Sequence, residues 1–186
     1  AGLEARLRSW WGSGDLAWFF DHGEDRLQLD ARIMGFDLTE LLDHPYARVP
    51  ALLYLFHRAD QALDGRPTIL CIDEGWKALS DPAFSPVIED WQRTIRKRNG
   101  LVIFGSQSAS SVLAAPMGRV IIEQSPTQLF LPNAKADYES YVGGFHLSTR
   151  EYQLIRNLPA DSHAFLLKQG TKSTVARLDL TALDDD

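Results

Sequence analysis

The sequence has 186 residues and carries 19 Lys and Arg against 25 Asp and Glu, which gives a formal net charge of −6 at pH 7. Its 45% hydrophobic and 24% charged residues predict one soluble globular domain and exclude collagen-like, disordered and disulfide-stabilised classes. No apolar run approaches the roughly 20 residues that a membrane-spanning helix needs. The negative charge also argues against a nucleic-acid-binding domain, which normally has a basic footprint.

Turn signals interrupt the first 42 residues, where we expect only short strands near Trp18–Phe20 and Ile33–Leu38. Apolar residues then recur at helical spacing until Gly65 and Pro67, which are typical stop signals. This pattern predicts a helix over Tyr46–Asp64.

A continuous apolar run over Pro67–Ile72 predicts a strand that is buried on both faces, as in a parallel sheet. Cys71 lies inside this run, so we expect a buried small hydrophobe rather than a reactive thiol. The strand ends abruptly in two acids, Asp73 and Glu74.

The residues Asp81 and Pro82 predict the start of a second amphipathic helix, which Asn99 and Gly100 end. Its last turn carries four basic residues, which complement the negative end of the helix dipole. These residues are Arg93, Arg96, Lys97 and Arg98.

Strands and helices continue to alternate to the end of the chain. We expect strands over Leu101–Phe104 and Gln128–Leu131, a short helical stretch reaching Pro116, helices near Lys135–Val142 and Thr149–Asn157, and a hairpin of Ala164–Lys168 with Thr174–Leu178. Ser148 and Glu151 have capping-box spacing at the start of the last helix. The order predicts an α/β fold with a mostly parallel sheet flanked by helices and a C-terminal antiparallel hairpin.

In open parallel sheets, ligands bind beyond the carboxyl ends of the strands, which is where Asp73 and Glu74 lie. Four apolar residues followed by Asp-Glu match the second nucleotide motif of P-loop ATPases. There the first carboxylate holds Mg²⁺ through its coordinated water and the second polarises the attacking water. An acid pair that only caps the following loop is the competing interpretation, because such strings are common.

Two further side chains fit the same chemistry. Gln107 follows the next strand and could donate to the γ-phosphate of ATP or orient the attacking water. Arg96 could reach the nucleotide of a neighbouring subunit as an arginine finger, although a solvated helix end is the alternative. The phosphate-binding pattern G-x-x-x-x-G-K-[ST] does not occur in the sequence. Neither metal-ligand spacing among the five histidines nor a G-x-S-x-G elbow occurs either.

At these residues the sequence resembles the C-terminal ATPase domain of the VirB4/TrbE/CagE family of type IV secretion and conjugation systems. The resemblance covers nearly the whole chain in order. It rests on Gly35–Thr39, Pro50–Arg58, Ile72–Leu79, Ile95–Gly100, Ser106–Ser108, Ile122–Asn133 and Leu147–Glu151.

This resemblance implies a RecA-like fold of the HerA/FtsK type, with Asp73 and Glu74 as the Walker B pair and Gln107 as the glutamine of the following motif. Arg96 matches an arginine that related ATPases present across a hexamer interface, and Arg119 is a second choice on position alone. One departure is Gly75, where family members commonly carry a bulky residue.

The resemblance also implies that residues 1–186 form a single domain, truncated upstream of Ala1, where the Walker A loop would lie. We therefore expect the isolated chain to be inactive. Its parent would hydrolyse ATP with Mg²⁺ as a homo-oligomeric, hexameric ring in the cytoplasm, peripheral at the inner membrane. Other secretion components are the expected partners, and DNA is a further candidate partner.

Two alternatives remain open. One is a DNA-translocating coupling ATPase of the same superfamily, which stimulation of turnover by DNA would distinguish. The other is a non-catalytic docking module of the secretion machine, which the absence of an upstream phosphate-binding loop would favour.

Overall fold

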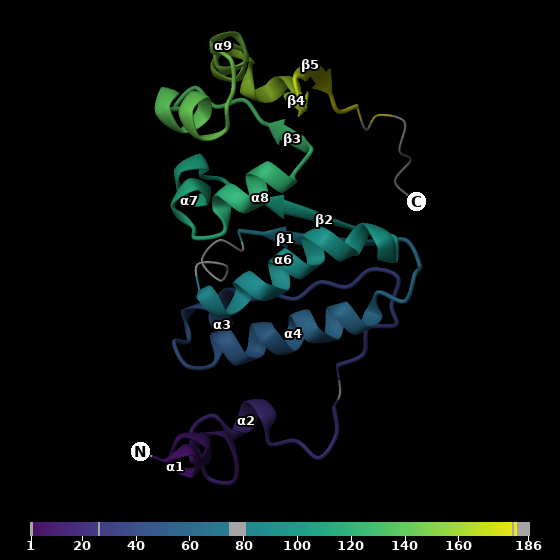
Figure 1. Ribbon diagram of the computed structural model, residues 1–186, viewed down its shortest axis with the longest axis vertical. Coiled ribbons are helices and arrows are strands. Elements are labelled where there is room, and N and C mark those ends of the chain that lie inside the picture. Colours follow the sequence, from purple (N-terminus) through teal and green to yellow (C-terminus); the bar gives the residue numbers. More distant parts are fainter. Residues whose placement is uncertain (1, 26, 75–80, 180, 182–186) are drawn as a thin grey trace. The chain divides into compact units, whose positions relative to one another are not determined.

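The computed structural model describes residues 2–25, 27–74, 81–179 and 181, and divides the chain into two compact units, Ala1–Phe104 and Gly105–Asp186 (Figure 1). Each unit is described by itself. No helix among the described residues is both long and apolar enough to cross a lipid bilayer.

The first unit begins with short helices rather than strands. These are α1 (Leu3–Leu7), the 3₁₀ turn η1 (Arg8–Trp10), α2 (Ala17–Phe20) and α3 (Thr39–Asp43). The strand expected near Trp18–Phe20 is therefore wrong, and so is that at Ile33–Leu38, which has no regular structure. The aromatic run favours a strand by propensity, but its backbone bonds locally, with Phe19 N donating to Leu16 O over 3.1 Å.

Helix α4 (Arg48–Ala62) confirms the predicted long helix and ends before the stop signals. Strand β1 (Thr68–Asp73) follows, then the 3₁₀ turn η2 (Pro82–Phe84), α6 (Ser85–Thr94), a further 3₁₀ turn η3 (Ile95–Arg98) and strand β2 (Gly100–Gly105). Asp81 caps η2 through a 3.0 Å bond from Ala83 N. Asn99 ends η3 in the left-handed conformation, at φ 60°.

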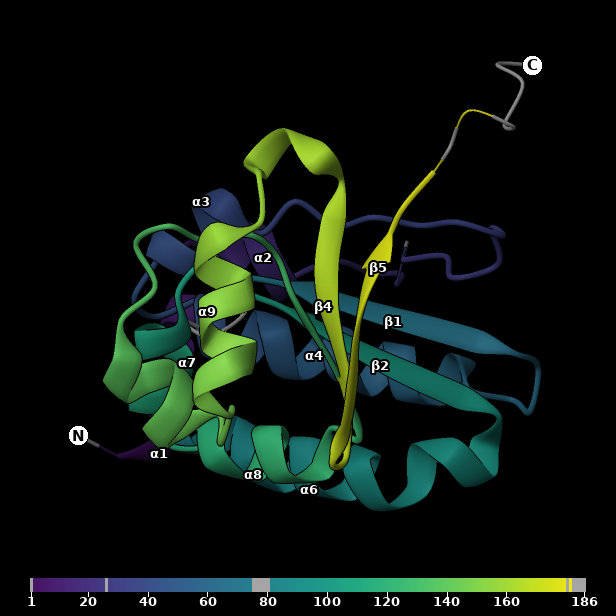
Figure 2. The same cartoon turned by 90° about the horizontal axis from the view of Figure 1, so that it is seen from above.

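Strands β1 and β2 form a two-stranded sheet and lie side by side in Figure 2. The amide of Thr68, at the start of β1, donates over 3.2 Å to the carbonyl of Asn99, immediately before β2. Because the two starts are adjacent, the strands are parallel. Their carboxyl ends therefore lie at one edge of the sheet and their amino ends at the other.

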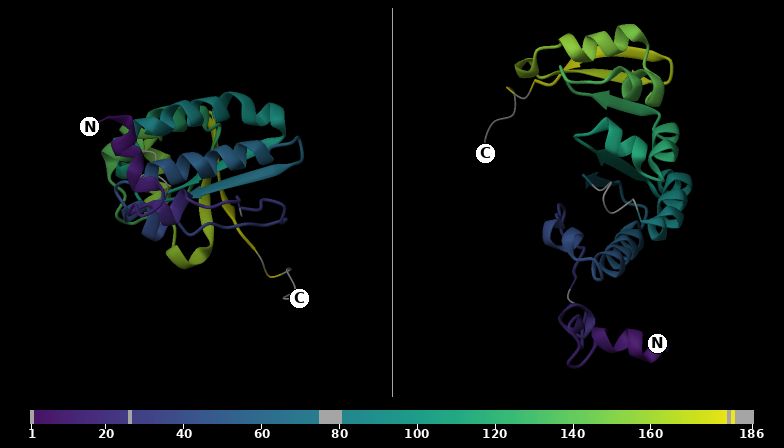
Figure 3. Two further views of the ribbon diagram at one scale, coloured as in Figure 1. Left: turned by 90° about the horizontal axis from the view of Figure 1, so that it is seen from below. Right: turned by 90° about the vertical axis from the view of Figure 1, so that its left-hand side faces the viewer.

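Helices α4 and α6 cover the same face of this sheet (Figure 3). Phe56 of α4 packs edge-on against Trp91 of α6, with ring centroids 5.1 Å apart. Side chains on the opposite face of the sheet alternate with the covered ones and are exposed. Ile69 of β1 is 62% exposed and Leu101 of β2 is 53% exposed. The expectation of burial on both faces is thus wrong for β1, and Cys71 is exposed rather than buried.

The second unit contains α7 (Ala109–Ala114), α8 (Gly118–Gln124), β3 (Thr127–Phe130), the π-helix η4 (Glu139–Gly144), α9 (Thr149–Asn157), the 3₁₀ turn η5 (Ala160–Ser162), β4 (Ala164–Gln169) and β5 (Lys172–Arg177). Strand β4 pairs antiparallel with β3 on one side and β5 on the other. Gly170, at φ 58°, makes the hairpin turn. The core of this unit includes Phe130, Ile155 and Leu166.

Glu151 joins α9 to the sheet of the second unit. Its Oε2 accepts hydrogen bonds from the amide of Ser148 at 2.7 Å and from the Nζ of Lys168 at 3.1 Å, which confirms the predicted capping box. Burial raises the pKa of this carboxyl, but hydrogen bonds from Ser148, Ser173 and Lys168 outweigh burial and lower the pKa to about 2. The ionised Glu151 therefore stabilises the folded unit.

Glu151→Gln should lower the free energy of unfolding by about 2 kcal/mol at pH 7, because it removes a charge-assisted network. The folded pKa lies below the ordinary value of 4.5, so the contribution is complete above that value and disappears as the pH falls toward 2. Urea unfolding followed by circular dichroism at pH 7 and pH 2.5 measures both effects. The exposed Glu123→Gln is the matched control, and equal destabilisation by both variants would contradict the prediction.

Cys71 should react completely with a maleimide in the native chain, at a rate comparable with that of the chain in urea, because the outer face of β1 exposes it. Mass spectrometry of timed samples measures the reaction. Strong protection in the native state would show that this face is covered.

Candidate functional site

The two predicted Walker B acids lie together at the carboxyl end of β1. Asp73 is the last residue of the strand, and both carboxylates are exposed. Glu74 has a left-handed backbone, with φ 47°, which is uncommon for a residue other than glycine. The chain therefore turns out of the strand directly at the acid pair, and strained backbone of this kind is typical of functional sites.

Gln107 lies two residues beyond the end of β2, in a short turn that leads into α7. The hydroxyl of Ser106 accepts a 3.2 Å hydrogen bond from the amide of Ser108, and the hydroxyl of Ser108 accepts one from the amide of Ser111. These bonds fix the turn on both sides of the exposed Gln107. The chain itself thus presents this amide just after a strand end, as the sequence predicts.

Arg96 lies in η3, at the amino end of the β1–β2 sheet, whereas the acids lie at its carboxyl end. The length of β1 separates the two ends by roughly 17 Å, from about 3.3 Å per strand residue. The structure does not bring Arg96 to the acids of its own unit. Arg96 is exposed at that opposite end.

The four basic residues at the end of the second predicted helix differ in their surroundings. Arg98 pairs with Asp60 and donates to the carbonyl of Leu63, whereas Arg93 approaches Glu89 at 3.7 Å. The side chains of Arg96 and Lys97 are exposed and form no ion pair with any residue that the structure describes. No sequence pattern predicts Asp60 as the partner of Arg98, because the two residues lie 38 positions apart.

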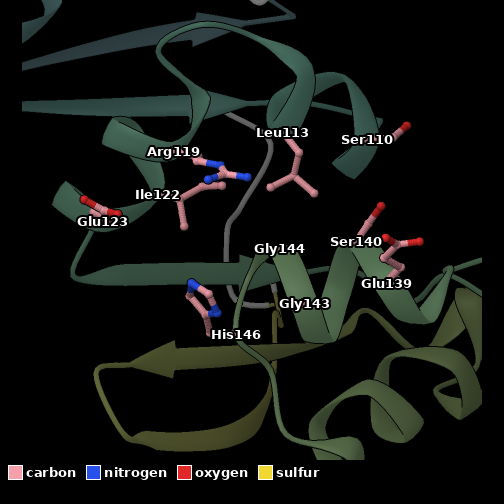
Figure 4. A pocket seen from close by; sticks show the side chains of 10 residues that line it. All are labelled: Ser110, Leu113, Arg119, Ile122, Glu123, Glu139, Ser140, Gly143, Gly144 and His146. Carbon is pink, nitrogen blue, oxygen red and sulfur yellow. The ribbon is translucent and has the colours of Figure 1, made fainter.

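Arg119, the second candidate for the finger, lines a pocket of about 520 Å³ in the second unit (Figure 4). Its side chain and that of Leu113 point toward the hollow, which is bounded across from them by Gly143 and Gly144 of the π-helix. A side chain at Gly144 would place its Cβ 2.3 Å from Leu113 Cδ1, so glycine permits this close approach. The pocket contains none of Asp73, Glu74, Arg96 or Gln107. Its lining residues are Ser110, Leu113, Arg119, Ile122, Glu123, Glu139, Ser140, Gly143, Gly144 and His146.

No group of three or more His, Cys, Asp and Glu side chains could hold a metal ion in the described part of the chain. Mg²⁺ nevertheless fits the acid pair, because it keeps several waters and commonly uses only one or two carboxylates besides nucleotide phosphates. Asp73, exposed at the strand end, is the residue that would hold it through water. The departure at Gly75 and the rest of that motif, residues 76–79, lie outside the described residues.

Comparison with known proteins decides between the family resemblance and chance similarity. The chain is 44% identical over 186 residues to the type IV secretion system protein virB4 of Bartonella henselae, covering 100% of this chain and 24% of that protein. It is 44% identical to the type IV secretion system protein PtlC of Bordetella pertussis, covering 94% of this chain and 21% of that protein. The chain is VirB4-like over its whole length.

The resemblance inferred from the motifs is thereby confirmed, although no family model matches the chain. The structure of VirB4 of Thermoanaerobacter pseudethanolicus matches with a TM-score of 0.71 at 23% identity, over 95% of this chain and 48% of that chain. This match confirms the α/β fold class. The VirB4-like chain spans about a quarter of the length of the curated relatives.

Arg98→Ala should lower the free energy of unfolding of the first unit by about 1–3 kcal/mol, because it leaves the half-buried Asp60 without its cation. Arg96→Ala should change it by less than about 0.5 kcal/mol, as expected for an exposed side chain without an ion pair. Urea unfolding followed by tryptophan fluorescence measures the unfolding of this first unit, since all five tryptophans lie at or before residue 91. Equal effects of the two substitutions would contradict this distinction.

Proposed function

We propose that this VirB4-like chain supplies the Walker B acids, the following glutamine and a trans-acting arginine of an ATP-hydrolysing type IV secretion motor. The observation that carries the proposal is the exposed Asp73–Glu74 pair, at the carboxyl end of a strand in a parallel sheet. Its relatives are type IV secretion system proteins, which favours a motor over an acid pair that only caps a loop.

Each residue has a separate task in the proposed reaction. The carboxylate of Glu74 accepts a hydrogen bond from the attacking water and draws its proton, which raises the nucleophilicity of the oxygen. Gln107 donates from its amide toward the γ-phosphate or the same water. Asp73 would hold a hydrated Mg²⁺, which, when bound, neutralises negative charge on the phosphates. The guanidinium of Arg96 stabilises the charge that develops in the transition state of a neighbouring copy.

The remaining parts of the site belong, in this proposal, to sequence outside these 186 residues. The phosphate-binding loop is one such part, because no G-x-x-x-x-G-K-[ST] occurs in the chain. The parent acts as a ring of identical copies, at the cytoplasmic face of the inner membrane, together with other secretion components. The position of Arg96, far from the acids of its own unit, supports catalysis between copies.

Glu74→Gln in the full-length parent should reduce ATP turnover at least about 100-fold, because an amide cannot accept the proton of the water. The affinity for ATP should remain close to that of the unaltered protein. Steady-state phosphate release and the binding of a fluorescent ATP analogue measure the two quantities.

Glu89→Gln is the matched control, since Glu89 is a carboxylate on α6 that pairs only weakly with Arg93. This control should hydrolyse ATP normally. Full turnover by the Glu74→Gln parent would refute the catalytic assignment, and a parent without ATPase activity would favour a docking module.

A further inference from the structure

The turn η3 combines a free cationic surface with a firmly anchored backbone. Arg96 and Lys97 at its centre are exposed, whereas Ile95 on one side is buried and Arg98 on the other reaches into the unit. A four-residue 3₁₀ turn has poor internal hydrogen-bond geometry and needs support from its surroundings. The contacts of its flanking residues supply that support.

Asp60, near the end of α4, is the centre of the first anchor. Its carboxylate accepts a hydrogen bond from the guanidinium of Arg98 and a 3.0 Å bond from Nε1 of Trp91. Arg98 also donates to the backbone carbonyls of Asp60 and Leu63. One guanidinium thus satisfies carbonyls at the end of α4 and ties them to the turn, a task that suits the planar fork of arginine.

The two residues after the turn form a second anchor. Asn99 donates from its side-chain amide to the carbonyl of Gly65 at 3.1 Å, and its own carbonyl accepts from Thr68. A side chain at Gly100 would place its Cβ 2.5 Å from Ile95 Cγ1, so the chain folds back tightly on the buried Ile95. The turn is therefore held at α4, at the loop before β1 and at the start of β2.

We infer that Asp60 and Arg98 are positioning residues for Arg96: they fix η3 so that its guanidinium is presented to a neighbouring copy without further ordering of the backbone. This inference rests on the proposed function, in which Arg96 acts across a subunit interface. A side chain that stabilises a transition state loses much of its effect when it is displaced by about 1 Å. Ordering the turn in advance therefore raises the turnover rate more than it changes the affinity for ATP.

The test uses the full-length parent with Asp60→Asn or Arg98→Lys. Asp60→Asn keeps the shape of the side chain but removes its charge. Arg98→Lys keeps the positive charge but removes the planar guanidinium that donates several hydrogen bonds at once. Each should lower kcat for ATP about tenfold or more, with little change in KM, because the finger acts on the transition state. Thermal unfolding shows which variants remain folded, and a folded Arg98→Lys parent suffices for the test.

Mixing variants that have low turnover distinguishes a positioning role from a general structural defect. A ring that combines Asp60→Asn with Glu74→Gln subunits contains interfaces where an intact acid pair meets a correctly held Arg96. When the two variants are mixed in equal amounts and assemble at random, roughly one interface in four combines the two intact groups. ATP turnover should therefore rise well above that of either variant alone. Arg96→Ala mixed with Glu74→Gln should recover in the same way.

Lys97→Ala and Glu89→Gln are the matched controls, because they remove charges from the same turn and the preceding helix without touching the anchors. Both should keep the kcat of the unaltered parent. The inference is overturned if Asp60→Asn and Arg98→Lys keep full kcat while Glu74→Gln and Arg96→Ala abolish it, or if mixing restores nothing to folded Asp60→Asn. Full turnover by Glu74→Gln would instead overturn the proposed function itself.

Discussion

The parallel pairing of β1 with β2 is the constraint on which the first unit depends. Two parallel strands cannot be joined by a tight hairpin, so the chain must cross back over the sheet, here through α6 and η3. The crossing places α6 against α4 on one face. It also sends the acid pair to one edge of the sheet and the basic turn to the other, which gives the unit two chemically opposite ends.

This separation of charges has a physical basis in both helices and strands. The carboxyl end of a helix exposes carbonyl groups, so positively charged side chains are stabilising there. Arg93 and the three basic residues of η3 lie at this end of the crossing connection. The carboxyl end of β1, in contrast, is open to solvent, so its last side chains can stay hydrated. Asp73 and Glu74 are therefore exposed without the penalty that buried carboxylates would incur.

Much of this arrangement follows from the sequence, but tertiary partners do not. The apolar run before Asp73 correctly predicts a strand, and Ser148 with Glu151 correctly predicts the start of α9. The exposure of one face of β1 was not predictable, because an unbroken apolar run has no alternation that marks its exposed side. Propensity also misled at Trp18–Phe20, where the backbone forms the short helix α2 with local hydrogen bonds. The pairing of Asp60 with Arg98 depends on how α4 packs, and no local pattern encodes it.

The positive φ of Glu74 places two selective pressures in conflict at one residue. A left-handed backbone is favourable for glycine and costs other residues about 1–2 kcal/mol, so glycine would stabilise this turn. Glycine would also remove the carboxylate that the proposed hydrolysis requires. Stability alone would therefore drive position 74 toward glycine, and retention of an acid there would mark lineages in which the proposed ATP hydrolysis is still under selection. A VirB4-like sequence with glycine at this position would be expected to combine a relaxed turn with a lost catalytic role.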